Sequence, residues 1–376
     1  MEATSSPAST GQRLRVGIVG GGEQSAIGRA HRLAQRLSER FDLVAGAFDI
    51  DAARGRRYAV AHGVAADRAY ANVEELVERE RARDDPVDMV CVLTPNNTHF
   101  DIACTLLRAG FHVLCEKPMT TRVSDAEELA RLTKERNAVF GVMYGYSGYP
   151  MIAAARELVR SGEIGSVRTV QSEFAFGLPV NLSEDPQGHW RTKKGIAGES
   201  AVVGMLATHV LYLITMITGL HARQVAADFQ SFVPGRLLED NANLLLRFDG
   251  GAAGSMWNSY VAAGFDNGPR LRIYGDAGGI EWDHDYPNQL RLYKPGKPRQ
   301  TLTQASANSN PLAPEGFVEC FAAVYRQLAD AIEATRGRAA GATRYPSVLD
   351  GLEGVRFVAA AVESSARNSA WVDVAR

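Results

Sequence analysis

Two short polar segments in the first third of the chain carry side chains suited to chemistry. Thr94-Pro95-Asn96 and His99 follow the apolar run 87–93, and Glu116-Lys117-Pro118 follows the run 111–115. In an open α/β sheet, ligands bind where such strands end. A lysine placed there loses solvent, which lowers its pKa toward the range of a proton-transfer group. Taken singly, Lys117 reads equally well as a surface charge, and His99 as a polar residue at a helix start.

A glycine-rich turn follows the first apolar run, 14–19. It reads Gly20-Gly21-Gly22 and continues, after two residues, as Ser25-Ala26-Ile27-Gly28. Gly20 and Gly22 match the G-x-G-x-x-G pattern, which brings a pyrophosphate close to backbone N–H groups at a helix start. Ser25 stands where the third glycine belongs. Because the turn closes the first strand of an alternating unit, it favours a dinucleotide site over a plain strand–helix connection.

Asp49 stands at the end of the second apolar run, 43–48. Dinucleotide sites carry a ribose-binding acid about 20 residues beyond the glycines. A carboxylate there accepts hydrogen bonds from the 2′-hydroxyl and repels a 2′-phosphate, so Asp49 favours NAD. Arg54, Arg56 and Arg57 follow closely, which keeps NADP open as the alternative.

The elements that must position these residues alternate between apolar strands and helices up to residue 145. The helix after Asn97 is expected to be capped by that residue, and the next one by a Ser124-x-x-Glu127 capping box. Strands are predicted at 14–19, 43–48, 87–93, 111–115 and 138–143. This alternation predicts an α/β unit, a doubly wound parallel Rossmann sheet.

The pattern changes after Gly145, where longer strands separated by turn residues dominate. Asp249-Gly250 and Gly275–Gly279 are typical of hairpin turns. Strands are predicted at 167–176, 224–232, 243–248, 252–259, 271–274, 280–282 and 290–293, and helices at 151–161, 201–217, 317–335 and 351–365. This half predicts an α+β unit, a predominantly antiparallel open sheet with helices on one face. The chain then divides into a flexible tail (1–12), a Rossmann domain (13–145) and a substrate-binding and oligomerisation domain (146–376).

Composition argues against several other classes of protein. Of the 376 residues, 45% are hydrophobic and 22% charged, and 41 Lys and Arg against 43 Asp and Glu give a net charge of −2. Nucleic acid is therefore a poor candidate partner, and no apolar run is long enough for a membrane span. Four cysteines without C-x-x-C spacing indicate a reducing cytoplasm. His189 and His209 lack partners at metal-ligand spacing, so no metal site is expected.

Taken together, these segments resemble the glucose–fructose oxidoreductase/inositol dehydrogenase (Gfo/Idh/MocA) family. Tyr149-Pro150, Trp190-Arg191 and the Pro-Glu-Gly-Phe that begins at Pro314 also fit, so the resemblance covers nearly the whole chain. The resemblance implies an NAD(P)-dependent oxidoreductase that transfers hydride between nicotinamide and a secondary hydroxyl of a sugar, glycoside or cyclitol. The cofactor-binding residues expected on both grounds are Gly20, Gly22, Ser25, Ala26, Ile27, Asp49, Thr94, Pro95, Asn96, His99, Glu116, Lys117 and Pro118.

The resemblance also implies the catalytic residues. In such enzymes the lysine of Glu-Lys-Pro, here Lys117, contacts the reacting hydroxyl, and a helix of the second domain carries an Asp followed four residues later by a His. This chain keeps His209 but has Met205 at the Asp position. A methionine can neither relay a proton nor orient a base. His209 is the expected general base, sharing the proton with Lys117 and titrating near neutral pH. Without the resemblance, His209 reads as a core residue of an apolar helix.

Substrate contacts are expected near the domain junction and in the second domain. Aromatic faces stack on sugar rings, while Arg and Asn bind hydroxyls; ordinary core packing is the alternative for the aromatic residues. The candidates are Tyr146, Tyr149, Asn181, Trp190, Arg191, Met205 and His209.

Two other functions fit the same fold. One is a cofactor- or sugar-binding regulator with reduced catalysis, for which Met205 is the main argument. The other is a keto-sugar reductase that recycles a tightly held cofactor. The uncovered face of the second sheet predicts a homodimer or homotetramer. The sequence leaves the substrate, the reacting hydroxyl and the direction of the reaction open.

Overall fold

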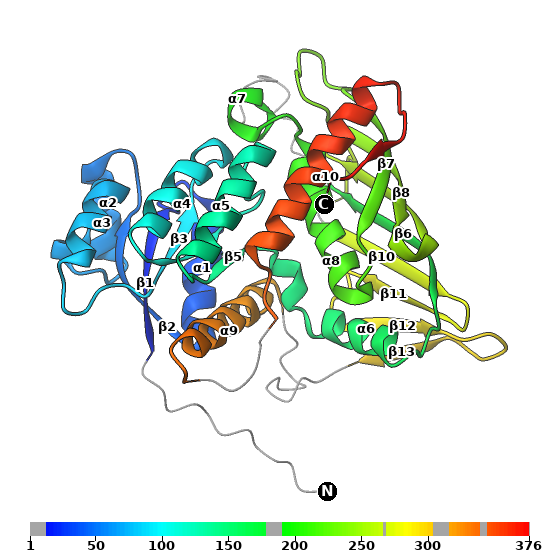
Figure 1. The fold of residues 1–376 in the computed structure, drawn as a ribbon, viewed down its shortest axis with the longest axis horizontal. Coiled ribbons are helices and arrows are strands. Elements are labelled where there is room, and N and C mark those ends of the chain that lie inside the picture. The colour runs from blue at the N-terminus through cyan, green and yellow to red at the C-terminus, as the bar shows by residue number, and fades with distance from the viewer. Residues whose placement is uncertain (1–12, 178–189, 266–267, 304–315, 339–343, 376) are drawn as a thin grey trace, which may run out of the picture.

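The computed structural model describes residues 13–177, 190–265, 268–303, 316–338 and 344–375. These residues form two β-sheets on opposite sides of the molecule, with helices packed between and around them (Figure 1). The tail predicted at 1–12 lies outside the described residues.

The first sheet is parallel, with five strands in the order β2-β1-β3-β4-β5. Its strands are β1 (Leu14–Gly20), β2 (Phe41–Ala47), β3 (Met89–Leu93), β4 (His112–Cys115) and β5 (Phe140–Val142). Every residue of β3 is buried, as an apolar strand covered on both faces requires. The strand order reverses between β1 and β3, so a ligand crevice is expected beyond their carboxyl ends. The predicted Rossmann sheet is confirmed.

Five helices accompany this sheet. They are α1 (Ala26–Ser38), α2 (Ala52–Ala61), α3 (Val73–Arg81), α4 (His99–Arg108) and α5 (Val123–Glu135), with 3-10 turns η1 (Ala66–Arg68) and η2 (Asn96–Thr98). Two predicted helix starts are wrong. Asn97 lies within η2 and does not cap α4. Ser124 lies inside the first turn of α5, where its hydroxyl donates to Asp125, and Arg122 occupies the N-cap position.

The second sheet has nine strands and is mostly antiparallel; β6 and β9 pair in parallel. Its order is β13-β12-β11-β10-β6-β9-β8-β7-β14. The strands are β6 (Val167–Ala175), β7 (Ala222–Gln230), β8 (Asn241–Phe248), β9 (Ala253–Ser259), β10 (Gly268–Gly275), β11 (Gly279–Asp283), β12 (Gln289–Tyr293), β13 (Gln300–Thr303) and β14 (Val372–Asp373). The 3-10 turn η7 (Asp249–Gly251) joins β8 to β9, and residues 276–278 join β10 to β11, as the two predicted hairpins require. The predicted open antiparallel sheet is confirmed.

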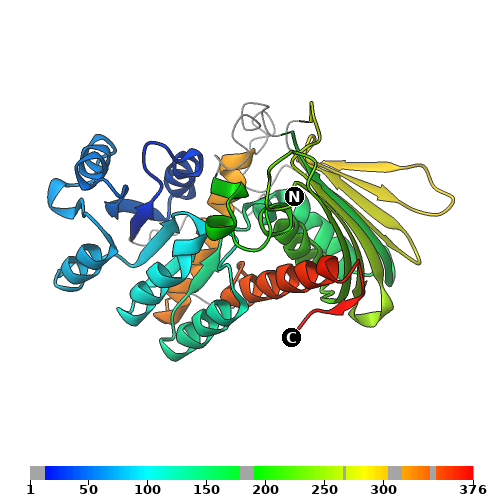
Figure 2. The same cartoon turned by 90° about the horizontal axis from the view of Figure 1, so that it is seen from above.

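The helices of the second half lie on one face of this sheet, on the side of the first sheet (Figure 2). They are α6 (Pro150–Arg160), α7 (Lys194–Ala197), α8 (Thr208–Thr218), α9 (Phe317–Thr335) and α10 (Val348–Ala366), with 3-10 turns η3 (Gly145–Gly148) and η5 (Trp190–Thr192). α6, α8 and α10 pack on the sheet, whereas α9 returns to pack on α1 of the Rossmann unit. The predicted helix 201–217 differs at its start, because the segment Val203–Ala207 (η6) is a π-helical turn.

Two absences concern only the described part of the chain. None of its helices combines the length and hydropathy needed to cross a membrane. Nor do its His, Cys, Asp and Glu side chains gather in groups of three that could hold a metal ion.

Candidate active site

The glycine-rich turn joins β1 to α1 and depends on the absence of side chains. Gly20 has a positive φ of 81°, which favours glycine. A Cβ at Gly22 would lie 2.4 Å from the carbonyl oxygen of Phe48, and one at Gly28 only 2.1 Å from that of Gly21. Gly28 therefore meets the close-packing requirement that the usual third glycine meets. Ser25, which occupies the usual glycine position, caps α1 by accepting a hydrogen bond from the Gly28 N–H at 3.1 Å.

Asp49 lies two residues beyond β2, at the same edge of the sheet, and pairs with Arg54 of α2. Its two carboxylate oxygens each lie 2.7 Å from a guanidinium nitrogen of Arg54. These hydrogen bonds, together with one from the Asp51 N–H, hold the pKa of Asp49 below its usual value. Asp49 is therefore ionised at neutral pH, and Arg54 is bound to it side-on.

His99 links the two polar segments that follow β3 and β4. Its ring nitrogens each lie 2.9 Å from a carbonyl oxygen, one of Pro118 and one of Thr94. Burial is the largest influence on His99 and lowers its pKa. Asn96 turns toward the second half, donating to the carbonyl oxygen of Ala197 at 3.1 Å. His99 thus holds the two segments together, and its predicted cofactor contact stays a prediction.

The two halves of the chain enclose a cavity of about 270 Å³ beside the N-terminus of α1. Seven of the residues predicted from the sequence line it: Ile27, Glu116, Lys117, Tyr146, Arg191, Met205 and His209. The remaining lining residues are Met143, Phe174, Phe176, Leu206, Tyr260, Phe317 and Phe321. A cofactor turn, a lysine of the first half and a histidine of the second therefore meet in one largely aromatic cavity.

Lys117 reaches across the cavity to the π-helical turn, where its Nζ donates to the main-chain oxygen of Met205 at 3.1 Å. The pKa of Lys117 falls from 10.5 to about 8. Burial is the main cause, and the positive charge of Arg191 adds to it, while the carboxylate of Glu116 acts in the opposite direction. Near neutral pH, this amine is close to its proton-exchange range.

His209 lies in the first turn of α8 and is 6% exposed. The rings of Tyr146 and Tyr144 pack edge-on against it, with centroids 5.0 and 5.7 Å away. Burial, and after it the charge of Lys117, lowers the pKa of His209 well below its usual value. Its Nδ1 has no hydrogen-bond partner among the described residues. The neutral ring therefore retains proton-accepting capacity, but it titrates below the near-neutral range predicted for it.

Two predicted substrate residues of the described chain, Tyr149 and Trp190, lie outside the cavity lining. Tyr149 is buried outside the cavity lining, with its hydroxyl 3.2 Å from Nε2 of His284. Trp190 lies beneath the guanidinium of Arg191, 4.4 Å from ring centroid to Cζ, and is also outside the lining. Asn181 lies outside the described residues. Their contact with substrate stays a prediction.

Sequence reasoning missed His31 and the contribution of α9. His31 is fully buried in α1 and lies 3.0 Å from the carboxylate of Glu116. Phe317 and Phe321 of α9 line the cavity, and Tyr325, one turn further, contacts His31. The spacing i, i+4, i+8 on α9 was the available signal, because it places these rings on one helix face.

Comparisons with known proteins identify the family of this chain. Residues 14–144 match the family model described as an oxidoreductase family with an NAD-binding Rossmann fold, and residues 152–281 match the GFO/IDH/MocA C-terminal domain. The fold and site define an NAD-dependent dehydrogenase. The chain belongs to the GFO/IDH/MocA oxidoreductase family, as the sequence resemblance predicts.

Similar proteins extend over almost the full chain. An inositol dehydrogenase homologue from Azotobacter vinelandii, solved with NAD+, is 38% identical with a TM-score of 0.90, covering 96% of this chain and 97% of that one. A structure of an inositol dehydrogenase homologue from the same organism with NADH and myo-inositol gives a TM-score of 0.88 at 38% identity, covering 96% and 98%. The uncharacterised oxidoreductase YfiI of Bacillus subtilis is 36% identical over 96% of each chain. Levoglucosan dehydrogenase of Pseudarthrobacter phenanthrenivorans is 26% identical over 96% of this chain and 98% of that one.

The described residues fit NAD as the cofactor. The turn at Gly20–Gly22 is kept free of side chains where a pyrophosphate must approach a helix start. Asp49 presents an ionised carboxylate at the end of β2, suited to ribose hydroxyls. Ile27, Glu116 and Lys117 lie where the cavity meets α1. These residues would hold the two ends of the dinucleotide.

Proposed function

We propose that this dehydrogenase oxidises a secondary hydroxyl of a sugar, glycoside or cyclitol, with Lys117 and His209 as its catalytic residues. The convergence of the lysine amine and the histidine imidazole on one cavity carries the proposal. The neighbouring aromatic rings of Tyr146, Phe174 and Tyr260 suit the C–H faces of a ring-shaped polyol. Relatives named for myo-inositol and levoglucosan support this substrate class.

A bound NAD would supply the hydride acceptor for this oxidation. Oxidation also requires the hydroxyl proton to leave. His209 is neutral and accepts that proton, while the ammonium of Lys117 donates a hydrogen bond to the same oxygen and stabilises its developing negative charge. The Met205 carbonyl holds the Lys117 amine in place. The aromatic wall excludes water from the reacting groups.

The regulator and the recycling reductase are the competing functions. A regulator is favoured by Met205, because no carboxylate at that position orients His209. The shared cavity of Lys117 and His209 favours an enzyme instead. A reductase with a captive cofactor would retain stoichiometric NAD through extensive dialysis, whereas a dehydrogenase that exchanges its cofactor would lose it.

The test is turnover of a panel of sugars, glycosides and cyclitols, followed by nicotinamide absorbance. Lys117→Ala should lower kcat by about 10²–10⁴-fold, and His209→Ala by a comparable factor, because each removes a group at the proton-transfer step. Lys134→Ala, on the exposed face of α5, is the matched control and should retain wild-type kcat. Circular dichroism checks the fold of each variant. Wild-type kcat in both Lys117→Ala and His209→Ala would place the chemistry elsewhere.

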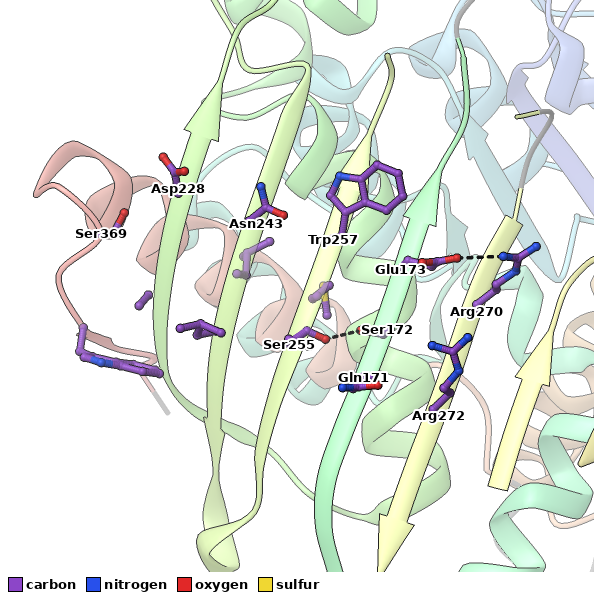
Figure 3. A pocket seen from close by; sticks show the side chains of 15 residues that line it. Gln171, Ser172, Glu173, Asp228, Asn243, Ser255, Trp257, Arg270, Arg272 and Ser369 are labelled. Atoms are coloured by element: carbon purple, nitrogen blue, oxygen red, sulfur yellow. Dashed lines mark hydrogen bonds and ion pairs between the residues drawn. The ribbon is translucent and has the colours of Figure 1, made fainter. Parts of the chain in front are cut away.

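We also propose that the outer face of the second sheet joins copies of this chain (Figure 3). The helices cover only the inner face. The outer face forms a shallow hollow of about 590 Å³ crossed by β6, β8, β9 and β10. The large apolar side chains exposed in it are Leu245, Trp257 and Trp371, each at least 36% exposed. Such a patch, bordered by charged residues, is suited to a self-complementary interface.

A further inference from the structure

His31 is a buried histidine that the proposed mechanism does not use. It lies in α1, one turn beyond Gly28, and its side chain has no exposed area. Its Nε2 lies 3.0 Å from one carboxylate oxygen of Glu116, and its Nδ1 lies 2.7 Å from the hydroxyl of Tyr325. His31 therefore bridges the residue before Lys117 to the helix that lines the far wall of the cavity.

The hydrogen bonds around His31 run in one direction. Gln35 donates to the Tyr325 hydroxyl at 3.0 Å. The Glu116 carboxylate can only accept, so Nε2–H of His31 donates to it; in that tautomer Nδ1 accepts from the Tyr325 hydroxyl. Burial raises the pKa of Tyr325 well above its usual value, so the phenol keeps its proton and acts as a donor.

Glu116 is held at both carboxylate oxygens. One accepts from His31, and the other accepts from the main-chain N–H of Lys117 at 3.1 Å. Burial by itself would raise the pKa of Glu116, but the hydrogen bond from His31 and, after it, the charge and main-chain N–H of Lys117 act in the opposite direction, and the pKa of Glu116 is lowered. A buried, ionised carboxylate is thus fixed beside the catalytic amine.

We infer that His31 is a positioning residue for Lys117, which it serves by holding the carboxylate of Glu116 against the Lys117 main chain while Tyr325 holds His31. The inference rests on the proposed function of Lys117. Because α9 carries both Tyr325 and the cavity residues Phe317 and Phe321, the same helix shapes the cavity and supports the lysine.

The network acts on the protonation of Lys117. The charged and titratable groups that face the amine are Glu116, Arg191, His209 and His99. Of these, the Glu116 carboxylate alone raises the pKa of Lys117, against burial and Arg191. Without His31, the buried carboxylate loses a charge-assisted hydrogen bond and takes up a proton more readily. Lys117 would then lose the neighbouring negative charge of Glu116, and its pKa would fall below its present value of about 8.

The experiment measures the pKa of Lys117 directly in the full chain without substrate. Acetic anhydride acylates only the neutral amine, and mass spectrometry of the Lys117 peptide across pH gives its half-reaction point. His31→Phe and Glu116→Gln should each shift that point downward by roughly one unit. The double variant should shift no further than Glu116→Gln alone, since His31 acts through Glu116. His31→Gln keeps an N–H donor and should restore most of the wild-type value.

Cys91→Ala is the control for lost packing. The Cys91 thiol lies 3.3 Å from the Tyr325 hydroxyl, and among the described residues no hydrogen bond joins it to His31 or Glu116, so this variant should lose stability without moving the Lys117 half-reaction point. A folded His31→Phe with an unchanged point, or a double variant whose two shifts add, overturns the inference. Because labelling needs no turnover, failure of the proposed substrate class would appear separately, as inactivity of a wild type whose Lys117 still titrates near pH 8.

Discussion

Asp49 and Arg54 form the contact in the site that bears most directly on cofactor choice. The guanidinium of Arg54 donates hydrogen bonds to both carboxylate oxygens of Asp49. A 2′-phosphate arriving here would meet the negative charge of Asp49 and would compete with it for Arg54. The pair therefore favours NAD over NADP.

Asp49→Ala should reverse that preference, because it removes the repulsion and releases Arg54. We expect kcat/KM with NADP+ to rise at least about 10-fold relative to NAD+, the worth of one charge-assisted contact. Steady-state kinetics with both coenzymes measures the ratio. The double variant Asp49→Ala, Arg54→Ala should lose the gain, and a ratio unchanged by Asp49→Ala would show that other residues set the preference.

Met205 leaves the proposed catalytic amine of Lys117 without a neighbouring carboxylate at this position. Lys117 donates to the neutral carbonyl of Met205, not to a carboxylate, and its pKa is about 8 instead of 10.5. Its charge is therefore lost as the pH rises through about 8. His209, whose pKa lies well below its usual value, stays neutral across that interval. With Lys117 in its proposed catalytic role, we expect the kinetic ionisation on the alkaline side to belong to this residue.

Met205→Asp should move the alkaline limb of the kcat profile to higher pH. A carboxylate beside Lys117 favours its charged form and returns its pKa toward 10.5, so the ammonium persists further into alkaline solution. Kinetics from pH 6 to 10 measures the limb. Met205→Asn is similar in size to the acid but neutral, and its limb should stay near pH 8. A limb unmoved by Met205→Asp would assign that ionisation to another group.

At the residue scale, side chains at strand ends or on a single helix face could be predicted. Lys117 could be placed at a strand end from the pattern, but it was the family resemblance that put Lys117 and His209 in the same expected site. His31 could not be predicted in this way. Its partners lie 85 and 294 residues away, and no local pattern marks a contact of that range.

At the element scale, the glycine turn shows why the displaced third glycine still works. Gly28 lies three residues later than the usual position. The backbone of α1 packs on the carbonyl of Gly21 at Gly28, so this is the position at which a side chain would clash. The helix predicted at 201–217 did not include the π-helical turn at its start. Its π-helical start is fixed by Glu239, which accepts from the Ser200 hydroxyl and the Val202 N–H. A cap supplied from so far along the chain leaves no local trace.

Gly28→Ala should damage the turn and the helix together. The new Cβ would lie 2.1 Å from the Gly21 carbonyl oxygen, so α1 must move away from the turn. We expect the Kd for NAD+ to rise at least about 10-fold and Tm to fall, as overpacking of a close backbone contact commonly costs 1–3 kcal/mol. Calorimetric titration and thermal unfolding measure the two effects. Gly195→Ala, where a Cβ meets nothing within 4 Å, is the control and should change neither.

At the scale of the whole molecule, sheet types were predictable, but the path of α9 was not. Buried apolar strands alternating with helices predict a parallel sheet, and longer strands joined by hairpin turns predict an antiparallel one. α9 has an ordinary amphipathic pattern, and nothing in it indicates that it leaves the second sheet to pack on α1. That crossing places Tyr325 of α9 in the hydrogen-bond network of His31 and Glu116, next to Lys117.

The outer face of the second sheet carries the last consequence of the fold. Trp257 of β9 stands on this face (Figure 3). Leu245 of β8 is also exposed, and the partly exposed Trp371 lies beneath the guanidinium of Arg247. Arg270 of β10 pairs with Glu173 of β6 and with Asp283 and Asp285, so the charged border is already satisfied within one chain. Association of two copies would therefore bury the apolar centre of this face and leave Arg270 at its edge paired with carboxylates of its own chain.

A charge at the centre of this face should separate the copies. Leu245→Glu, at a position 55% exposed, places a carboxylate where a second sheet would desolvate it. We expect light scattering at micromolar concentration to give a dimer or tetramer for the wild type and a monomer for Leu245→Glu. Leu349→Glu is the matched control, since Leu349 is 66% exposed on α10, away from this face, and its assembly should be unchanged. A monomeric wild type, or an oligomer that tolerates both substitutions equally, would mean that the outer face is exposed to solvent and that its tryptophans have another role.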